Sequence, residues 1–283
     1  MSQFNQPYYG DVLQDMNRVV VDHVVNHPRS LQKTIGPSEM GCDRCIARHF
    51  AGVEKMPETQ IDMSMDLDEL VSKMPWLPQI GTSWHATLEE WFEEENQRLL
   101  EETGYERWLV ENRVPVGAIG GRFIDGSCDL FDLWTGSVID HKLVGTTKLK
   151  KVRSKRSPGL TYRKQAHVYG RGWALKGYDV RKVGVRFYPR NDISMAAGIL
   201  WIEDFDPEFA EAAVDNVIAL SKTAQALAGT PALGTWIASL TPDADCFSCD
   251  EYPPLEGDLP AHDQAELVRS DLFSQPTPVQ RRY

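Results

Sequence analysis

The stretch Gly120–Gly145, GGRFIDGSCDLFDLWTGSVIDHKLVG, decides the fold. An apolar run rich in β-branched and aromatic residues reaches Trp134, turn residues follow at Thr135-Gly136, and a second run begins at Ser137. This pattern predicts two antiparallel strands joined by a two-residue turn, with Trp134 paired to Ser137. The central element is therefore a β-hairpin.

The register of the hairpin decides which charged side chains meet. Counting outward from a two-residue turn places Asp129 opposite Lys142, with Asp140 on the diagonal and within reach. Because strand side chains alternate between faces, the same count sends Asp132 to the other face. A loop of odd length would reverse the choice between Asp129 and Asp132, since a slip of one residue exchanges the faces.

Two carboxylates and a lysine on one face form a reactive combination. Asp129 and Asp140 can hold a divalent cation through oxygen ligands, and Lys142 can orient or deprotonate a water that attacks a phosphate. The alternative is an ordinary hairpin with solvated charges. The rest of the chain has to decide between the two.

Length and composition indicate one large domain or one domain with attachments, since the chain has 283 residues of which 42% are hydrophobic. The opening residues lack a basic segment followed by an apolar one, and no apolar run approaches bilayer length. We therefore expect a soluble, cytoplasmic protein. Two C-x-x-C pairs, Cys42 with Cys45 and Cys246 with Cys249, indicate metal ligation in a reducing compartment.

The formal net charge of -11 argues against a nucleic-acid partner, but its distribution argues for one. No Asp or Glu occurs between His141 and Tyr178, and eleven Lys and Arg do, which leaves 19 basic residues against 41 acidic ones elsewhere. This basic block predicts contact with a polyanion, and a flexible solvated loop over Lys148 to Pro158 is the alternative. The candidate DNA contacts are Lys148, Lys150, Lys151, Arg153, Lys155 and Arg156.

Helical patterns precede and follow the hairpin. The first begins at Gly81-Thr82, with Thr82 as the N-cap, and puts His85 in the first turn, where a histidine packs or caps unless other ligands reach it. In the second, Gln165 and Tyr169 are four residues apart and project from one face. Further elements are expected over residues 11–26, 66–74, 181–188, 199–203, 208–228 and 264–268.

Four motifs occur in a fixed order: G-T-x-x-H at residues 81–85, G-x-x-D at 126–129, I-D-x-K at 139–142 and Q-x-x-x-Y at 165–169. This set resembles the RecB-type branch of the PD-(D/E)XK nuclease superfamily over about residues 81 to 188. The resemblance implies an α/β fold with a central mixed sheet flanked by helices. It also implies a metal-dependent DNA exonuclease that uses Mg²⁺ or Mn²⁺.

The resemblance assigns roles to individual residues. His85, Asp129 and Asp140 would ligate the metal, with the backbone carbonyl of a nearby Ile or Lys as a further ligand. Lys142 would position or activate the attacking water, so that the catalytic group is Asp129, Asp140 and Lys142. The residues that it implies as contacts to the nucleic-acid strand are Gln165 and Tyr169.

The flanking cysteines are similar to those of the CRISPR-associated iron-sulfur exonuclease family, of AddB-like nucleases and of stand-alone bacteriophage relatives. In these a [4Fe-4S] cluster joins the two ends of the chain. The two-plus-two arrangement of Cys42, Cys45, Cys246 and Cys249 departs from their usual one-plus-three pattern. Four thiolates suit zinc equally, so zinc is the alternative to the cluster and an empty site is a third. Cys128 is interpreted as a small core residue.

We therefore expect a helical N-terminal region (1–80), a RecB-like nuclease core (81–230), a C-terminal cysteine segment (231–255) and a flexible tail (256–283). The expected activity is phosphodiester hydrolysis at single-stranded DNA ends in phage or bacterial recombination, repair or processing. A non-catalytic DNA-binding accessory of a recombination complex is the alternative. The sequence contains no G-x-x-x-x-G-K-[ST] motif, so ATP-driven unwinding would need a helicase partner.

Overall fold

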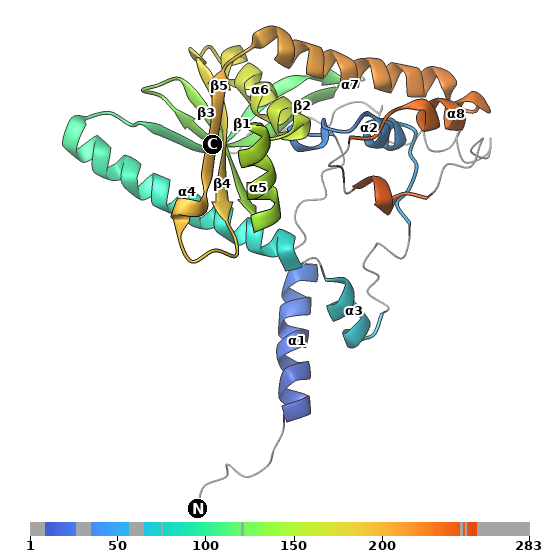
Figure 1. Ribbon diagram of the computed structural model, residues 1–283, viewed down its shortest axis with the longest axis horizontal. Helices are drawn as coiled ribbons and strands as arrows, with labels where there is room; N and C mark the ends of the chain where they lie inside the picture. The colour runs from blue at the N-terminus through green and yellow to red at the C-terminus, as the bar shows by residue number, and fades with distance from the viewer. Residues whose placement is uncertain are drawn as a thin grey trace, which may run out of the picture.

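A computed structural model describes residues 9–26, 35–56, 65–74, 76–119, 122–243, 246 and 248–253. The expected tail over 256–283, with its helical turn, lies outside these residues. A five-stranded sheet organises the molecule (Figure 1). Its strands are β1 (Trp108–Ile119), β2 (Arg122–Asp132), β3 (Ser137–Val144), β4 (Lys182–Pro189) and β5 (Ile199–Asp204).

The sheet is mixed, as the sequence predicts. The strands lie in the order β1-β2-β3-β4-β5, so each strand pairs with its neighbour in sequence. All pairs are antiparallel except β3 with β4, which are parallel. A parallel pair needs a long crossover connection, and two helices provide it, α5 (Thr146–Lys155) and α6 (Leu160–Leu175).

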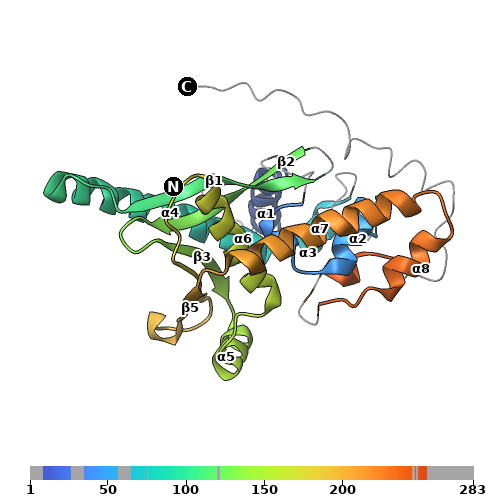
Figure 2. The ribbon, with the colours of Figure 1, turned by 90° about the horizontal axis from the view of Figure 1, so that it is seen from above.

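Helices cover both faces of the sheet (Figure 2). On β3, His141 stacks on Phe92 of α4 (Trp76–Thr103), whereas its neighbour Asp140 accepts a hydrogen bond from Gln165 of α6. Because neighbouring strand residues point to opposite faces, α4 and α6 lie on opposite sides of the sheet. The expected sheet flanked by helices is confirmed.

The main core lies between the sheet and α6. Trp173 of α6 is fully buried and stacks on Phe131 of β2, with ring centroids 4.7 Å apart. Val138 and Phe187, from the two parallel strands, join the same cluster. Burying side chains of this size contributes about 1.5–3 kcal/mol each, so this cluster fixes the strands against α6.

The N-terminal region is helical, as expected, and contains α1 (Tyr9–Asn26), the 3-10 turn η1 (Pro37–Glu39), α2 (Asp43–Phe50) and α3 (Leu67–Lys73). Helix α1 projects away from the sheet (Figure 1). By contrast, α2 packs through Ile46 and Phe50 on Val217 of α7 (Pro207–Leu227). The remaining elements are α8 (Ala232–Ser239), η3 (Met195–Ala197) and η4 (Ser248–Glu251).

Among the helices that the structure describes, none combines the length and apolar character needed to span a bilayer.

The predicted register of the central hairpin is wrong by two residues. Asp132, not Trp134, pairs with Ser137, and the loop has four residues rather than two. The Asp132 carboxylate accepts hydrogen bonds from the backbone of Trp134 (3.1 Å) and the hydroxyl of Thr135 (2.7 Å) and so closes the longer turn. Gly136 completes it at φ +65°, where a Cβ would lie 2.4 Å from the carbonyl oxygen of Asp179.

The predicted start of α4 is also wrong. The helix begins at Trp76 and runs through the expected boundary between residues 80 and 81. Thr82 is therefore not an N-cap, and its hydroxyl instead donates to the carbonyl of Pro78, one turn earlier (3.1 Å). Proline is compatible with the first turn of a helix, so Pro78 does not end the element. His85 consequently lies in the third turn rather than the first.

The basic segment after β3 is a helix, not the loop considered as an alternative. Leu149 and Val152 of α5 are both buried and anchor it. The polar face carries Lys150 and Lys155, which are exposed. The positive charges are thus held on one rigid element beside the strand that bears Lys142.

Candidate active site at the central hairpin

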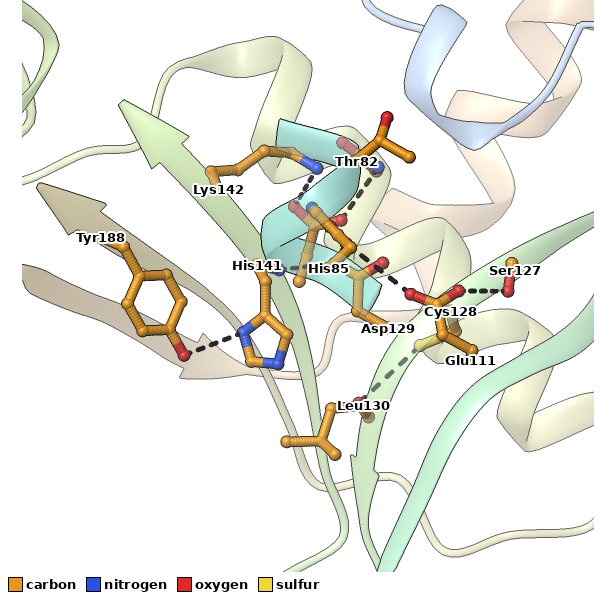
Figure 3. A network of polar contacts seen from close by, with 12 residues as sticks. Thr82, His85, Glu111, Ser127, Cys128, Asp129, Leu130, His141, Lys142 and Tyr188 are labelled. Carbon is orange, nitrogen blue, oxygen red and sulfur yellow. Dashed lines mark hydrogen bonds and ion pairs between the residues drawn. The ribbon is translucent and has the colours of Figure 1, made fainter. Parts of the chain in front are cut away.

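Three side chains from three elements converge at the site. The Nδ1 of His85, on α4, lies 3.5 Å from Oδ2 of Asp129, on β2, and 3.7 Å from Oε1 of Glu111, on β1 (Figure 3). One ligand atom from each of the three lies within 4.8 Å of the others, a spacing that suits a single metal ion. Of the predicted ligands, the structure thus brings His85 and Asp129 together.

The regular alternation of strand side chains between the two faces of the sheet breaks where these three residues meet. Cys128 and Phe131 both pack on Trp173 although they are three residues apart, so the alternation of β2 is interrupted between them, at Asp129. The facing residue of β1, Glu111, has a φ of +47°. A residue other than glycine in this region is strained by about 1–3 kcal/mol, and such strain is concentrated at functional sites.

The glycine of the G-x-x-D motif has a packing role. A Cβ at Gly126 would lie 2.7 Å from Cδ of Pro37 and 3.1 Å from Cε1 of Tyr169. Only glycine therefore lets both the N-terminal segment and α6 approach β2 this closely. Three residues further along the strand, Asp129 lies at the break in alternation.

Asp140 and Lys142 form a second part of the site. The Lys142 Nζ lies 2.7 Å from Oδ2 of Asp140, and the Gln165 amide donates to Oδ1 of Asp140 at 3.0 Å. Gln165 is 3% exposed and Tyr169 is 5% exposed. Their predicted contact with a nucleic-acid strand stays a prediction, and the contact found for Gln165 is with Asp140.

A backbone bond joins the two parts. The amide N–H of His141 donates to Oδ2 of Asp129 at 2.6 Å. The His141 ring points to the face of the sheet that α4 covers, opposite to the side chain of Asp140. There its Nδ1 is 3.4 Å from the hydroxyl of Tyr188. Burial lowers the pKa of His141 to about 4, which favours a neutral ring, and this ring stacks on Phe92.

The carboxylates of the site differ in their electrostatic surroundings. Burial would raise the pKa of Asp129, but its hydrogen bond with His85 and the charge of Lys142 hold that pKa below its usual range. Burial raises the pKa of Asp140 to about 6 despite the opposing charge of Lys142. Burial alone would lower the pKa of His85, yet its bonds to Asp129 and Glu111 raise it to about 10. Asp129 therefore carries its charge more readily than Asp140 does.

The basic helix joins the site through an aromatic ring. Lys142 and Lys148 both lie over the Tyr162 ring, at 5.7 Å and 4.9 Å from its centroid. Arg153 donates to the carbonyl of Ala197 at 3.0 Å. The exposed members of the predicted basic set are Lys150, Arg153, Lys155 and Arg156, whereas Lys148 and Lys151 are partly buried.

The four predicted thiolates meet in a separate cluster. The sulfur atoms of Cys42 and Cys249 lie 3.5 Å apart. The Cys45 sulfur lies 3.5 Å from that of Cys246 and 3.3 Å from that of Cys249. All four lie within 4.8 Å of one another, so the group can hold metal. Cys128 is fully buried in the main core, as interpreted from the sequence.

Glu111 is the residue that the sequence did not single out. It belongs to no motif, and its position depends on the pairing of β1 with β2 and on an unusual backbone angle. The only sequence signal is an acidic residue within an otherwise strand-like run. Its second oxygen accepts from the Ser127 hydroxyl at 2.7 Å, which holds the carboxylate toward His85.

No protein-family model and no curated protein matches the chain. Similar solved structures include that of SSO0001, with a TM-score of 0.39 and 14% identity over 74% of this chain and 86% of the other. They also include an alkaline exonuclease from Laribacter hongkongensis, LHK-Exo (TM-score 0.41, 16% identity, 73% and 90% covered), and LHK-Exo with dAMP (0.36, 17%, 77% and 87%). Because these scores lie below 0.5, the role of the site rests on its own residues.

Proposed function

We propose that the protein is a metal-dependent DNA exonuclease that hydrolyses phosphodiester bonds at the central hairpin. The supporting observation is the donor group of His85, Glu111 and Asp129 beside the ion pair of Asp140 and Lys142. Nitrogen and oxygen donors at this spacing suit a divalent cation such as Mn²⁺ or Mg²⁺. When bound, such a cation polarises a phosphate and lowers the pKa of water.

In this proposal each side chain has a separate task. His85, Glu111 and Asp129 would hold the cation, together with Asp140, which the resemblance also implies as a ligand. Lys142 orients the attacking water. Gln165 fixes the Asp140 carboxylate by donating to Oδ1, so that Oδ2 stays directed to Lys142. Loss of any of these groups lowers the rate of the chemical step.

The substrate class follows from charge. Helix α5 begins directly after β3 and carries basic residues without an acidic one, which favours a phosphate backbone. Lys142 and Lys148 both lie over the Tyr162 ring, so the basic helix lies close to the ion pair of Asp140 and Lys142. Three further parts of this proposal rest on the sequence alone. They are action at single-stranded DNA ends, location in the cytoplasm, and a role in recombination or repair.

The second candidate is a DNA-binding accessory protein without activity. It is favoured by the burial of Asp140, because a buried carboxylate paired with Lys142 is also typical of a purely structural ion pair. The two candidates share binding to DNA and differ in cleavage. A cleavage assay therefore separates them.

The experiment compares cleavage of end-labelled single-stranded and duplex DNA with Mn²⁺ or Mg²⁺ by wild type and by Lys142→Met. The control is Lys182→Met, which removes a lysine of β4 that pairs with Asp204 at the surface. We expect stepwise shortening by wild type and the control, and a loss of at least about a hundredfold in the Lys142 variant. Binding without cleavage by wild type would instead establish the accessory role.

A further inference from the structure

We infer that the four thiolates hold a single tetrahedral metal ion, zinc, and not the [4Fe-4S] cluster that the sequence resemblance implies. Four sulfur ligands at about 2.3 Å from one central zinc ion lie about 3.8 Å from one another. The sulfur atoms of Cys45 lie 3.5 Å and 3.3 Å from those of Cys246 and Cys249, and all four fall within 4.8 Å. This is the size of a one-ion site.

A [4Fe-4S] cluster does not fit this spacing. In such a cluster each cysteine sulfur binds a different iron, and the four irons and four sulfides lie between the thiolates. The thiolates then occupy the corners of a much larger tetrahedron. The Cys42 and Cys249 sulfurs, at 3.5 Å, are close to contact and leave no room for a cluster between them. Their spacing fits one metal ion and does not fit the cluster.

The surroundings complete a closed structural site. Cys42 is the N-cap of α2 and Cys45 lies within its first turn, while Cys249 belongs to η4. The backbone N–H groups of Asp243 and Cys45 donate to the Cys42 sulfur. Such bonds orient thiolate ligands and stabilise their charge. With four protein ligands, no position remains for a substrate, which is typical of structural zinc.

A buried arginine balances the charge of the site. Four thiolates and one divalent ion carry two net negative charges. Arg48 is 5% exposed and donates to the carbonyls of Cys249, at 3.0 Å, and Pro253, at 3.4 Å. Its guanidinium also lies over the Tyr252 ring, 5.1 Å from the centroid. A positive group thus lies beside the C-terminal cysteine, where it lowers the cost of burying the thiolates.

The test is the metal content of the full chain, produced with both iron and zinc in the medium and purified without oxygen. We expect about one zinc per chain, no acid-labile sulfide and no charge-transfer absorption in the visible range. Replacement by Co²⁺ should give the intense visible bands of tetrahedral cobalt thiolate. X-ray absorption at the zinc edge should show sulfur at about 2.3 Å and no metal–metal scattering.

About four irons with four sulfides per chain would overturn the inference, as would a chain that takes up neither metal. A paired variant locates the ion: Cys246→Ser should lose it, whereas Cys128→Ala, which changes the cysteine outside the cluster, should keep it. The inference does not depend on the proposed nuclease activity. Because metal content is measured on wild type, it remains decisive if the Cys246 variant does not fold.

Discussion

Asp129 and Asp132 lie three residues apart on one strand and have different partners. Asp132 accepts two hydrogen bonds from Arg107, at 2.9 and 2.8 Å, and closes the hairpin turn, whereas Asp129 faces His85. We expect Asp132→Asn to lower the free energy of unfolding by about 2 kcal/mol, because a partly buried arginine is deprived of its charged partner. It should leave cleavage per folded molecule unchanged.

Asp129→Asn should differ from Asp132→Asn in its effect on cleavage. It removes a proposed metal ligand, so we expect loss of cleavage per folded molecule. The free energy of unfolding should fall as well, because the charge of Asp129 is stabilised in the folded state by His85 and Lys142. Both variants are compared by urea unfolding and by cleavage of labelled DNA. Equal loss of activity in the two would show that the hairpin matters only as a scaffold.

Asp132 also predicts a pH dependence of stability. Burial would raise its pKa, but the hydrogen bonds from Arg107, Thr135 and the Trp134 backbone together outweigh burial and lower the pKa below the ordinary value of 3.8. Because the folded pKa is depressed, the stabilisation is present above pH 3.8 and is lost as the pH falls through the folded value. The difference in unfolding free energy between wild type and Asp132→Asn should therefore shrink at acid pH. A difference that stays constant from neutral pH into this acid range would contradict this.

Glu111 is the residue whose role is most directly testable by metal binding. Glu111→Gln keeps the size of the side chain and removes one negative charge from the donor group, so we expect roughly tenfold weaker binding of Mn²⁺ or more. Titration with Mn²⁺ followed by calorimetry measures this. Glu90→Gln, on an exposed part of α4, is the control and should bind as wild type does. If the two variants bound alike, Glu111 would be no ligand.

Among elements, the hairpin shows what sequence reasoning could and could not predict. Its two strands and the proximity of Asp129 to Lys142 follow from pattern and spacing. The register of the hairpin could not be predicted, because a four-residue loop closed by Asp132 contains the same turn residues as a two-residue loop. The structure places Asp129, rather than Asp132, beside His85 and Lys142, and its role there stays a prediction. Glu111 depends on strand pairing and a strained backbone, for which the sequence carries no sign.

Helix α5 predicts a salt effect. Lys150 and Lys155 are exposed on this helix, and removing one lysine that binds a phosphate reduces the slope of log affinity against log salt by about one unit. We expect the double variant Lys150→Gln/Lys155→Gln to bind single-stranded DNA more weakly and with a smaller slope, measured by fluorescence anisotropy. The matched control, Lys182→Gln/Lys222→Gln, removes the same charge elsewhere. Equal effects of both pairs would indicate only a general effect of net charge.

At the scale of the whole molecule, the thiolate site joins the N-terminal helices to the C-terminal segment. Arg44 of α2 adds bonds to the carbonyls of Leu240 and Ala238, at 2.8 and 2.7 Å. Removing the metal should lower the melting temperature and expose the segment after α8 to proteolysis, because bound metal stabilises only the folded form. Calorimetry and limited proteolysis of the metal-free chain measure both effects. Unchanged melting would show that packing alone holds the ends.

The two sites form at different times as the ribosome makes the chain. The hairpin site draws on residues 85 to 165, so all its parts are translated before Cys246 and Cys249. The cysteines that meet are 201 to 207 residues apart. At about 5–20 residues per second, Cys42 and Cys45 wait roughly 10–40 s for their partners. Throughout that interval both thiols lack two of the four ligands of their site, so they can be oxidised or can bind another metal. Completion of this protein therefore depends on the cell's thiol chemistry as well as on its own sequence.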